Sequence, residues 1–323
     1  MSGRRLRGFL LAGAAIVAAA VVLFVLSMPA RLSPKVLAGL SRADAAHGEE
    51  VFWASGCAAC HAQPGVKSGD RPVLSGGLEL KSGFGTFVVP NISPDPVHGI
   101  GKWTLADFAN AVMRGVSPGG RNYYPAFPYT SFSRMHPQDV ADLFAYLKTL
   151  PPSANDPRET SLAFPYSIRR GVDLWKWLYL HPGTVVSFNS ASDIVRRGQY
   201  LVEGPGHCGE CHTPRNAIGG QVLSKWLSGA RMPDGKGKAP NITPHRSGIG
   251  DWTAPEMVSF FQTGFTPDFD SVGGAMVEVQ ENLAHLPKSD LEAIAAYLKA
   301  IPPLPSSAGK DSHSRSEDEE GAG

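Results

Sequence analysis

Cysteine and histidine, the residue types best suited to bind a redox group, recur together in two short clusters of this chain. The clusters are Cys57-Ala-Ala-Cys60-His61 and Cys208-Gly-Glu-Cys211-His212, and they contain all four cysteines. Two thiols at this spacing can bond the two vinyl groups of one porphyrin, and the histidine that follows can ligate the iron. The pattern therefore predicts two covalently bound haem c groups, one on each cluster.

Other chemistry is open to a single C-x-x-C pair, which can form half of a zinc site, a thioredoxin-like redox pair or a disulfide. A zinc site needs four ligands around one metal and would leave both following histidines unexplained. Disulfides are unnecessary in a chain of 323 residues, which is long enough to bury a core without them. Covalent haem explains both clusters with no cysteine left over, so we favour it.

The sequence that follows each cluster is also repeated. The motif N-I-[ST]-P occurs at 91–94 and 241–244, G-I-G-x-W-T occurs at 99–104 and 248–253, and D-x-x-x-[LI]-x-A-Y-L-K-x-[LI]-P-P occurs at 139–152 and 290–303. Shared motifs in one order indicate a duplicated domain. We place the first copy at residues 41–153 and the second at 194–304.

Each copy is expected to fold as a small helical unit around its cofactor. Apolar residues at helical spacing predict helices over 48–55 and 197–203, over 105–115 and 254–264, and from about 137 and 287 onward. Thr104 and Thr253 are expected as helix caps, and Gly115 and Gly264 as helix stops. The elements that must position the clusters are therefore helices joined by loops rich in glycine and proline.

The order of these motifs resembles the multihaem cytochrome c subunits of membrane-bound alcohol and aldehyde dehydrogenases. Related dihaem cytochromes accompany other periplasmic dehydrogenases, including molybdenum hydroxylases. The resemblance covers roughly residues 44–304 and implies an all-α fold of two tandem class I cytochrome c-type domains that transfer electrons. The alcohol dehydrogenase subunits have three haem domains and this chain has two, which leaves the partner enzyme open.

The axial ligands of the two irons decide what the haems can do. His61 and His212 are expected as the proximal ligands, each oriented by a hydrogen bond to a backbone carbonyl. A strong sixth ligand restricts the iron to electron exchange, whereas an open position admits peroxide or gas chemistry. In the second copy we expect Met276, which follows two glycines in a loop where cytochromes of this type carry their axial methionine.

The first copy departs from this pattern. Its corresponding stretch reads Ala126-Phe127-Pro128-Tyr129, where the related subunits more often have A-M-P-Y, and a phenylalanine cannot bind iron. Met135 is the nearest candidate, although the repeat aligns it with Leu286, an apolar residue at a helix start. Met113, His136 and an open sixth position are the alternatives.

Four further residues repeat with the domain and are candidates for haem contacts. Trp103 and Trp252 could pack on the porphyrin edge or donate to a propionate, with ordinary core packing as the alternative. Asn91 and Asn241 could hold a loop near the haem. The remaining histidines are expected in solvated positions or local hydrogen bonds.

The N-terminus carries a stretch that could cross a membrane. Residues 9–28 are apolar and uncharged, and about twenty such residues suffice to span the hydrocarbon core as a helix. Arg4, Arg5 and Arg7 precede it and predict that residues 1–8 are cytoplasmic. A cleaved signal peptide or twin-arginine export is the alternative, although Ser27-Met28-Pro29-Ala30 fits a cleavage site poorly. We expect a single-pass inner-membrane anchor with the haem domains on the periplasmic side.

Two segments lie outside the repeat. Residues 154–193 contain the aromatic stretch Trp175-Lys176-Trp177 and are expected to pack across the junction between the domains. Residues 305–323 are polar and charged, and we expect a disordered tail there.

These observations predict a membrane-anchored dihaem cytochrome c that takes electrons from a periplasmic dehydrogenase and passes them to a quinone or terminal oxidase. It would be a subunit of a dehydrogenase complex and not a free-standing enzyme. A net charge of +1 gives no reason to expect nucleic acid. The first alternative is a dihaem peroxidase or thiosulfate-oxidising enzyme with an open or unusually ligated first haem. The second is a structural or sensory haem protein.

Overall fold

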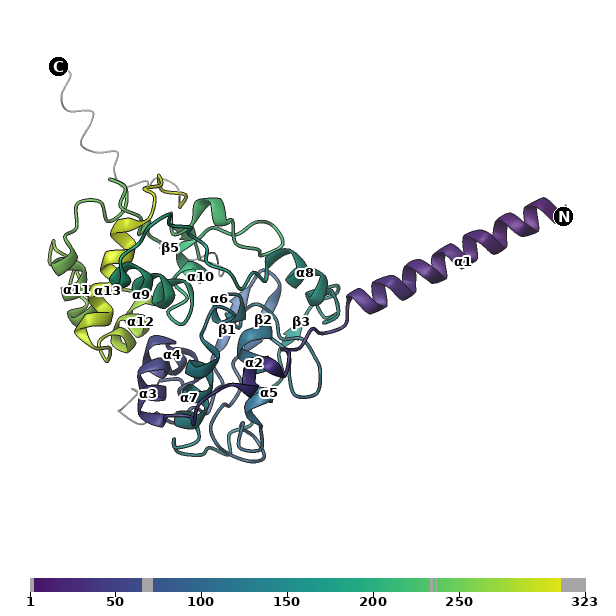
Figure 1. Ribbon diagram of the computed structural model, residues 1–323, viewed down its shortest axis with the longest axis horizontal. Helices are drawn as coiled ribbons and strands as arrows, with labels where there is room; N and C mark the ends of the chain where they lie inside the picture. The colour runs from purple at the N-terminus through teal and green to yellow at the C-terminus, as the bar shows by residue number, and fades with distance from the viewer. Residues whose placement is uncertain (1–2, 66–71, 233–234, 236, 309–323) are drawn as a thin grey trace, which may run out of the picture.

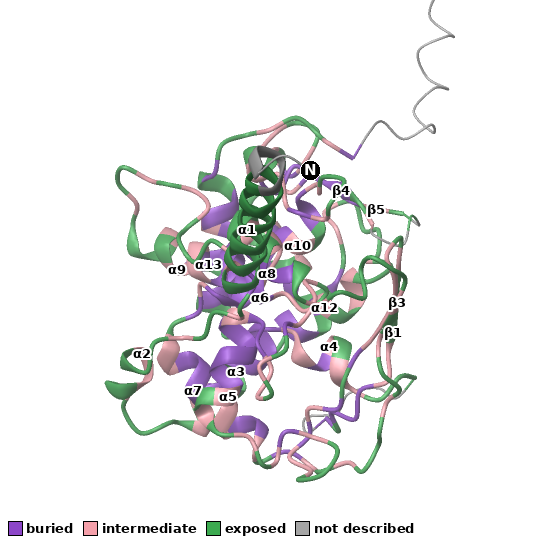
Figure 2. Cartoon of the chain, turned by 90° about the vertical axis from the view of Figure 1, so that its right-hand side faces the viewer, coloured by how far each residue is buried: buried purple, intermediate pink, exposed green. Residues whose placement is uncertain are grey.

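A long N-terminal helix projects from a folded body in the computed structural model, which describes residues 3–65, 72–232, 235 and 237–308 (Figure 1). This helix, α1 (Gly3–Leu26), is exposed from Arg7 to Val25 (Figure 2). Within the described residues it is the one helix long and apolar enough to cross a membrane, with a mean hydropathy of 2.9 over Arg7–Leu26. A signal sequence would meet the same criterion of length and composition.

The body consists of two helical halves whose elements follow the same order. The N-terminal half contains α2 (Lys35–Ala38), α3 (Ala45–Ala54), α4 (Cys57–His61), β1 (Glu79–Ser82), β2 (Gly85–Val88), α5 (Leu105–Arg114), α6 (Tyr129–Phe132) and α7 (Pro137–Leu147). The C-terminal half contains α9 (Asp193–Glu203), α10 (Gly209–His212), the 3-10 turn η1 (Leu223–Lys225), β4 (Ala230–Arg231), β5 (Lys238–Ala239), α11 (Ala254–Thr263), α12 (Met276–Leu283) and α13 (Lys288–Ala300). Between them lie β3 (Ser161–Leu162) and α8 (Gly171–Tyr179).

Each half is built on a crossing of its first and last long helices. Helix α3 packs on α7, and α9 packs on α13. Gly48 and Gly198 permit these crossings, because an added Cβ would lie 2.0 Å from the carbonyl oxygen of Asp142 in one half and 1.8 Å from that of Ala293 in the other. Only a residue without a side chain allows so close an approach of two backbones.

The expected caps of the middle helices are confirmed. Thr104 forms a capping box with Asp107 at the start of α5, and Thr253 forms one with Glu256 at the start of α11. Gly115 and Gly264 end these helices in the left-handed conformation, with φ of 61° and 77°. The sequence predicts these caps and stops because their contacts form within a few residues.

The prediction of a purely helical fold needs one correction. The described part of the chain also contains two small antiparallel sheets, β1-β2-β3 and β4-β5. The first pairs Leu80 with Phe87 and Gly85 with Leu162, and the second pairs Ala230 with Ala239. Strands of two to four residues, without a clear buried face, give no alternation that a sequence pattern could reveal.

The buried apolar residues of both halves form a continuous core (Figure 2). The segment between the halves contacts both of them through α8. Trp175 donates its indole N–H to the carbonyl of Ile218 at 2.9 Å, and Lys176 donates to the carbonyl of Gly115 at 2.9 Å. The two halves and the segment therefore share a single packed body.

The C-terminal boundary also differs from expectation. Residues 305–308, which the sequence analysis placed in the disordered tail, are held on the C-terminal half. The backbone N–H of Ser307 donates to the carbonyl of Ser228 at 2.9 Å, that of Ser306 donates to Ser247 Oγ at 3.0 Å, and Ala308 is buried. Composition does not reveal such backbone contacts. Residues 309–323, the rest of the expected tail, lie outside the described residues.

Candidate haem sites

The first cysteine cluster forms the short helix α4. Gly56 leads into it with a φ of 58°, and Cys57 and Cys60 stand three residues apart, which places both thiols on one side of the helix. His61 donates its Nδ1–H to the carbonyl of Pro90 at 2.8 Å, leaving Nε2 free to ligate a metal. Burial lowers the pKa of His61 to about 4, so the imidazole is neutral at pH 7.

The second cluster repeats this arrangement on α10. Cys208 is the N-cap of the helix, and His212 donates its Nδ1–H to the carbonyl of Pro240 at 2.8 Å. Burial again lowers the pKa of the imidazole. Two thiols and a neutral imidazole with a free Nε2 are the donor set that a covalently attached haem requires, so the residues of both clusters fit the group.

The two clusters face each other across the junction between the halves. Gly56 and His207 occupy equivalent positions of the repeat, and a Cβ added to Gly56 would lie 3.7 Å from His207 Cε1. Cys60 and Cys211 are also equivalent. Desolvation raises the pKa of the Cys60 thiol. The residue before the first cluster therefore meets its counterpart before the second cluster at the junction between the halves.

Each cluster is supported by the opposite half. Helix α4 contacts α12, and Trp53, just before the first cluster, stacks on His285 with ring centroids 3.7 Å apart. In the second cluster, Glu210 accepts hydrogen bonds from Thr130 Oγ1 at 2.6 Å and from Ser131 Oγ at 2.9 Å, both in the N-terminal half. The haem clusters are therefore part of the interface between the halves.

Glu210 and Tyr200 are interface residues that the sequence analysis missed. Burial alone would raise the pKa of Glu210, but Arg215 and the hydroxyl of Thr130 hold it below its usual value. Tyr200 on α9 donates its hydroxyl to Asp139 on α7 and stacks on His136 at 4.4 Å. Glu210 stands at a variable position of the C-x-x-C-H motif, so the motif does not predict a role for it. Tyr200 belongs to no motif, and the sequence around it does not indicate its partner Asp139.

The repeated asparagines fasten loops. Asn91 donates to the carbonyls of Ser153 and Asn155, each at 2.8 Å, and Asn241 donates to the carbonyl of Leu304 at 2.7 Å. Both loops lead from the proline whose carbonyl orients the histidine of the cluster, so the asparagines help to fix that carbonyl. A direct contact between either asparagine and haem stays a prediction.

The repeated tryptophans are half-buried at the edge of the core. Trp252 packs edge to face on Phe260, with ring centroids 5.5 Å apart. Trp103 precedes α5 and packs against the same continuous core. Their suggested contacts with haem also stay predictions.

Comparison with known proteins agrees with this geometry. The cytochrome c family model matches residues 45–151. A diheme c-type cytochrome of Cereibacter sphaeroides is 50% identical over 279 residues, which cover 86% of this chain and 93% of that protein. The chain belongs to the dihaem c-type cytochromes. This cytochrome accordingly carries two covalently bound haem c groups with their irons.

More distant relatives of the cytochrome are subunits of dehydrogenases. The fructose dehydrogenase cytochrome subunit of Gluconobacter japonicus is 36% identical, with 82% of this chain and 54% of that subunit aligned. The cytochrome c subunit of the quinone alcohol dehydrogenase of Gluconobacter oxydans is 37% identical, with 80% and 55% aligned. The dihaem cytochrome thus spans about half the length of these subunits, and its homology to them implies electron transfer.

The candidate sixth ligands of the dihaem cytochrome lie in different surroundings. Met276 begins α12 and is half-buried, while Met135 lies just before α7 and is 2% exposed. Phe127 packs edge to face on Tyr129 and Phe132, with centroids 6.3 and 5.9 Å apart. An aromatic cluster therefore occupies the stretch of the first half in which the related subunits more often have a methionine.

The surroundings of the alternative ligands Met113 and His136 leave both of them open as ligands. Met113 is buried within α5, and the ring of His136 is stacked on Tyr200. Ligation by Met135 and by Met276 stays a prediction.

Proposed function

We propose that this dihaem cytochrome is anchored in the inner membrane by α1, with both haem-binding halves on the periplasmic side. It would accept electrons from a dehydrogenase and pass them to a quinone or terminal oxidase. The apolar span of α1 and the arginines before it support this orientation. The dehydrogenase subunits among its relatives support the donor, and the alcohol dehydrogenase, which is named for quinone, supports the acceptor.

Each half would form one haem domain, with boundaries at 41–153 and 194–304. The residues that would hold the haems are Cys57, Cys60 and His61 in the first domain and Cys208, Cys211 and His212 in the second. Met135 and Met276 would be the sixth ligands. With both positions filled by methionine, neither iron would be open to substrate.

The observation that carries this proposal is the approach of the two clusters at the junction, where Gly56, just before the first cluster, lies beside His207, just before the second. Bound haem c supplies a reversible one-electron couple. The protein's contribution is position, because attachment at two clusters that approach each other at the junction would hold the two groups close enough for electrons to pass between them. The carbonyls of Pro90 and Pro240 orient the two histidines and increase their basicity as ligands.

The dehydrogenase as electron donor can be tested in right-side-out membrane vesicles from producing cells. Candidate substrates, beginning with a primary alcohol and fructose, are added while the haem c absorbance is recorded. We expect one substrate class to reduce both haems and a quinone analogue or oxygen to reoxidise them. Vesicles that contain the dehydrogenase but lack this chain are the control. Vesicles in which no substrate of a co-purifying dehydrogenase reduces the haems would contradict the proposal.

A second candidate function is a redox enzyme with an open first haem, and Phe127 is the observation that favours it. Carbon monoxide distinguishes the two, because an iron with two protein ligands resists it and an open iron binds it. The electron carrier is expected to bind little carbon monoxide when reduced. Binding of one molecule per chain, together with turnover of hydrogen peroxide, would favour the enzyme.

A further inference from the structure

Helix α8 buries both of its charged residues, together with Val172, and exposes three of its apolar residues, Leu174, Trp177 and Leu178. Asp173 and Lys176 are 2% and 7% exposed, and Lys176 donates to Asn122 Oδ1 at 2.6 Å. Trp177 and Leu178 in the same helix are 65% and 59% exposed. A helix at a protein–water boundary shows the reverse pattern, so the outer face of α8 is suited to an apolar environment.

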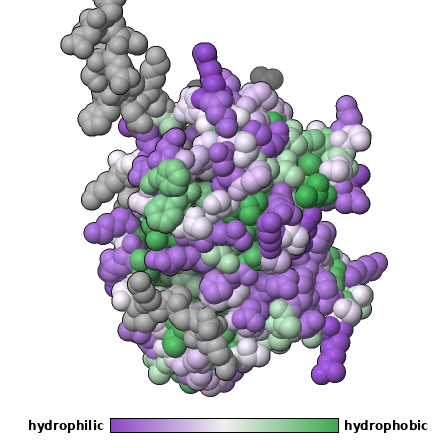
Figure 3. Space-filling view, turned by 90° about the vertical axis from the view of Figure 1, so that its left-hand side faces the viewer, coloured by the Kyte–Doolittle hydropathy of each residue, from purple (hydrophilic) through white to green (hydrophobic). Residues whose placement is uncertain are grey.

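The loop before α8 extends this apolar surface. Phe164 is 81% exposed, and Tyr166 and Ile168 are also exposed. We call the group the α8 surface; its members are Phe164, Tyr166, Ile168, Leu174, Trp177 and Leu178. By contrast, hydrophilic residues predominate on the face of the body opposite α1, where apolar residues form small separate groups (Figure 3).

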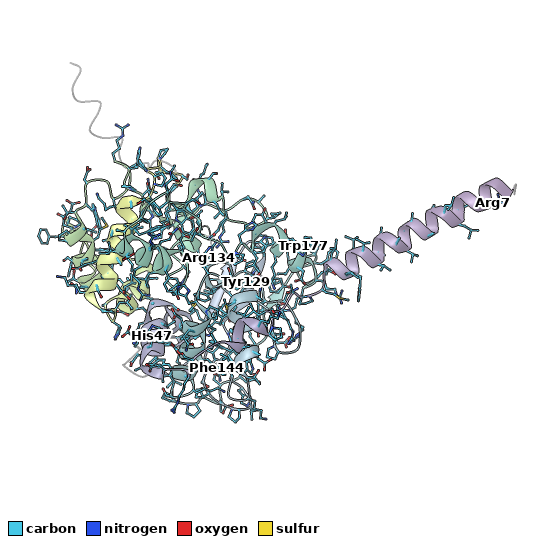
Figure 4. The ribbon with its side chains drawn as sticks, viewed as in Figure 1. Arg7, His47, Tyr129, Arg134, Phe144 and Trp177 are labelled. Atoms are coloured by element: carbon cyan, nitrogen blue, oxygen red, sulfur yellow. The ribbon has the colours of Figure 1, made fainter. Side chains whose placement is uncertain are left out.

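The α8 surface lies beside the end of the candidate membrane span. The guanidinium of Arg170 lies 4.1 Å from the ring centroid of Phe24, and its Nη1 donates to the carbonyl of Phe24 and to Ser27 Oγ, both at 3.3 Å. Helix α8 begins at the next residue. Figure 4 likewise shows Trp177 beside the point where α1 meets the body.

The charge of this segment suits anionic lipid headgroups. Within residues 163–182 the charged side chains are Arg169, Arg170, Asp173 and Lys176, and the last two are buried. The charges that remain near the surface are therefore the two arginines. Tryptophan and tyrosine with neighbouring arginine are the residues that gather at the membrane interface.

We propose that the α8 surface docks into the headgroup region of the bilayer that α1 spans. This rests on the proposed anchoring by α1 and adds a second, peripheral contact, which would hold the haem domains in a fixed orientation against the membrane. Arg170 would lie at headgroup depth, between the end of the span and the start of α8. The exposed side chains of α8 would enter the outer edge of the acyl region.

Photocrosslinking of the full-length holoprotein in nanodiscs of neutral and anionic phospholipid tests this docking. Trp177 is replaced by p-benzoyl-L-phenylalanine, and the matched control carries the same group at Phe269, which is 88% exposed in the C-terminal half. The haem spectrum reports folding of both variants, and alkaline carbonate extraction of native membranes reports anchoring by α1. Adducts are identified by mass spectrometry.

We expect phospholipid adducts at position 177 in at least tenfold excess over position 269. A carbonate-resistant protein whose position 177 gives no lipid adduct would overturn the docking and leave the anchor intact. Adducts at 177 with a second copy of the chain, or with another protein in native membranes, would also overturn it. Extraction of the protein by carbonate would instead refute the anchoring on which the docking rests.

Discussion

The indole of Trp53 and the imidazole of His285 lie face to face, with ring centroids 3.7 Å apart and planes inclined by 7°. Trp53 lies in α3, just before the first haem cluster on α4, and His285 lies between α12 and α13. The stack therefore joins the N-terminal half to the C-terminal half beside the clusters. Stacked ring pairs contribute about 0.5–1.5 kcal/mol beyond the area that they bury.

A double-mutant cycle on this stack should show coupling. Trp53→Ala and His285→Ala each remove one ring, so the double variant is expected to lose about 1 kcal/mol less than the sum of the single losses. Guanidinium unfolding of the oxidised holoproteins, followed by circular dichroism, measures the four free energies of unfolding. Strictly additive losses would show that the two rings do not stabilise the interface through each other.

The helix crossings predict that a side chain at Gly48 or at Gly198 would strongly destabilise the protein. Gly48→Ala and Gly198→Ala would place a methyl group 2.0 Å and 1.8 Å from a backbone carbonyl oxygen, so the long helices could not pack as they do. We expect the free energy of unfolding to fall by about 3 kcal/mol or more, as in other overpacked cores. Less haem should also be incorporated per chain. A pyridine haemochrome assay measures the haem content.

Gly171→Ala is the matched control for these variants. A Cβ at Gly171, the first residue of α8, meets no atom within 4 Å. Its haem content should equal that of the unchanged protein, and its free energy of unfolding should not fall. Equal haem content in the Gly48→Ala protein would contradict the account of the crossing.

How much of this structure a sequence can predict depends on the range of the interactions. The caps at Thr104 and Thr253 act within one helical turn, and the clusters around His61 and His212 carry their chemistry in five residues. By contrast, the approach of Gly56 to His207 depends on how the surfaces of the two folded halves fit together. The repeat defines each copy but leaves their docking open. The hydrogen bonds of Glu210 to the opposite half were hidden for the same reason.

The pair His47 and Asp142 predicts a pH-dependent contribution to stability. The Nδ1 of His47 lies 2.8 Å from Asp142 Oδ2. The hydrogen bond with Asp142 raises the pKa of His47 above 6.5, and despite burial the bond holds the pKa of Asp142 below 3.8. The protonated imidazole is thus favoured in the folded state. Its contribution is complete below pH 6.5 and is lost as the pH rises through the folded pKa of His47.

We therefore expect the loss in unfolding free energy caused by His47→Asn to be largest near pH 6 and to shrink towards pH 9. At the acid end, the contribution of Asp142 is lost as the pH falls through its own lowered pKa. Urea unfolding at several pH values measures the difference. In an Asp142→Asn background the same histidine substitution should show little dependence on pH, and a persistent dependence would mean that His47 senses other groups.

The sixth ligand of the first haem can be settled by spectroscopy of methionine variants. Met135 is buried beside α7, whereas Phe127 is enclosed by aromatic rings and has no atom able to bind iron. If Met135 is the ligand, Met135→Ala should convert one haem to a high-spin or ligand-exchanged form and leave the other unchanged. Met276→Ala should produce the complementary change, and Met113→Leu, a volume-conserving change in the core, should produce neither.

Met135→Ala and Met276→Ala should also differ from the unchanged protein in carbon monoxide binding. Removal of a sixth ligand opens one iron, so each reduced variant is expected to bind about one molecule per chain. The variant that lacks both Met135 and Met276 should bind about two. An unchanged spectrum for Met135→Ala would exclude this methionine as the ligand. If the unchanged protein already bound one molecule, the first haem would be open, and the interface beside Trp53 would border a reactive iron.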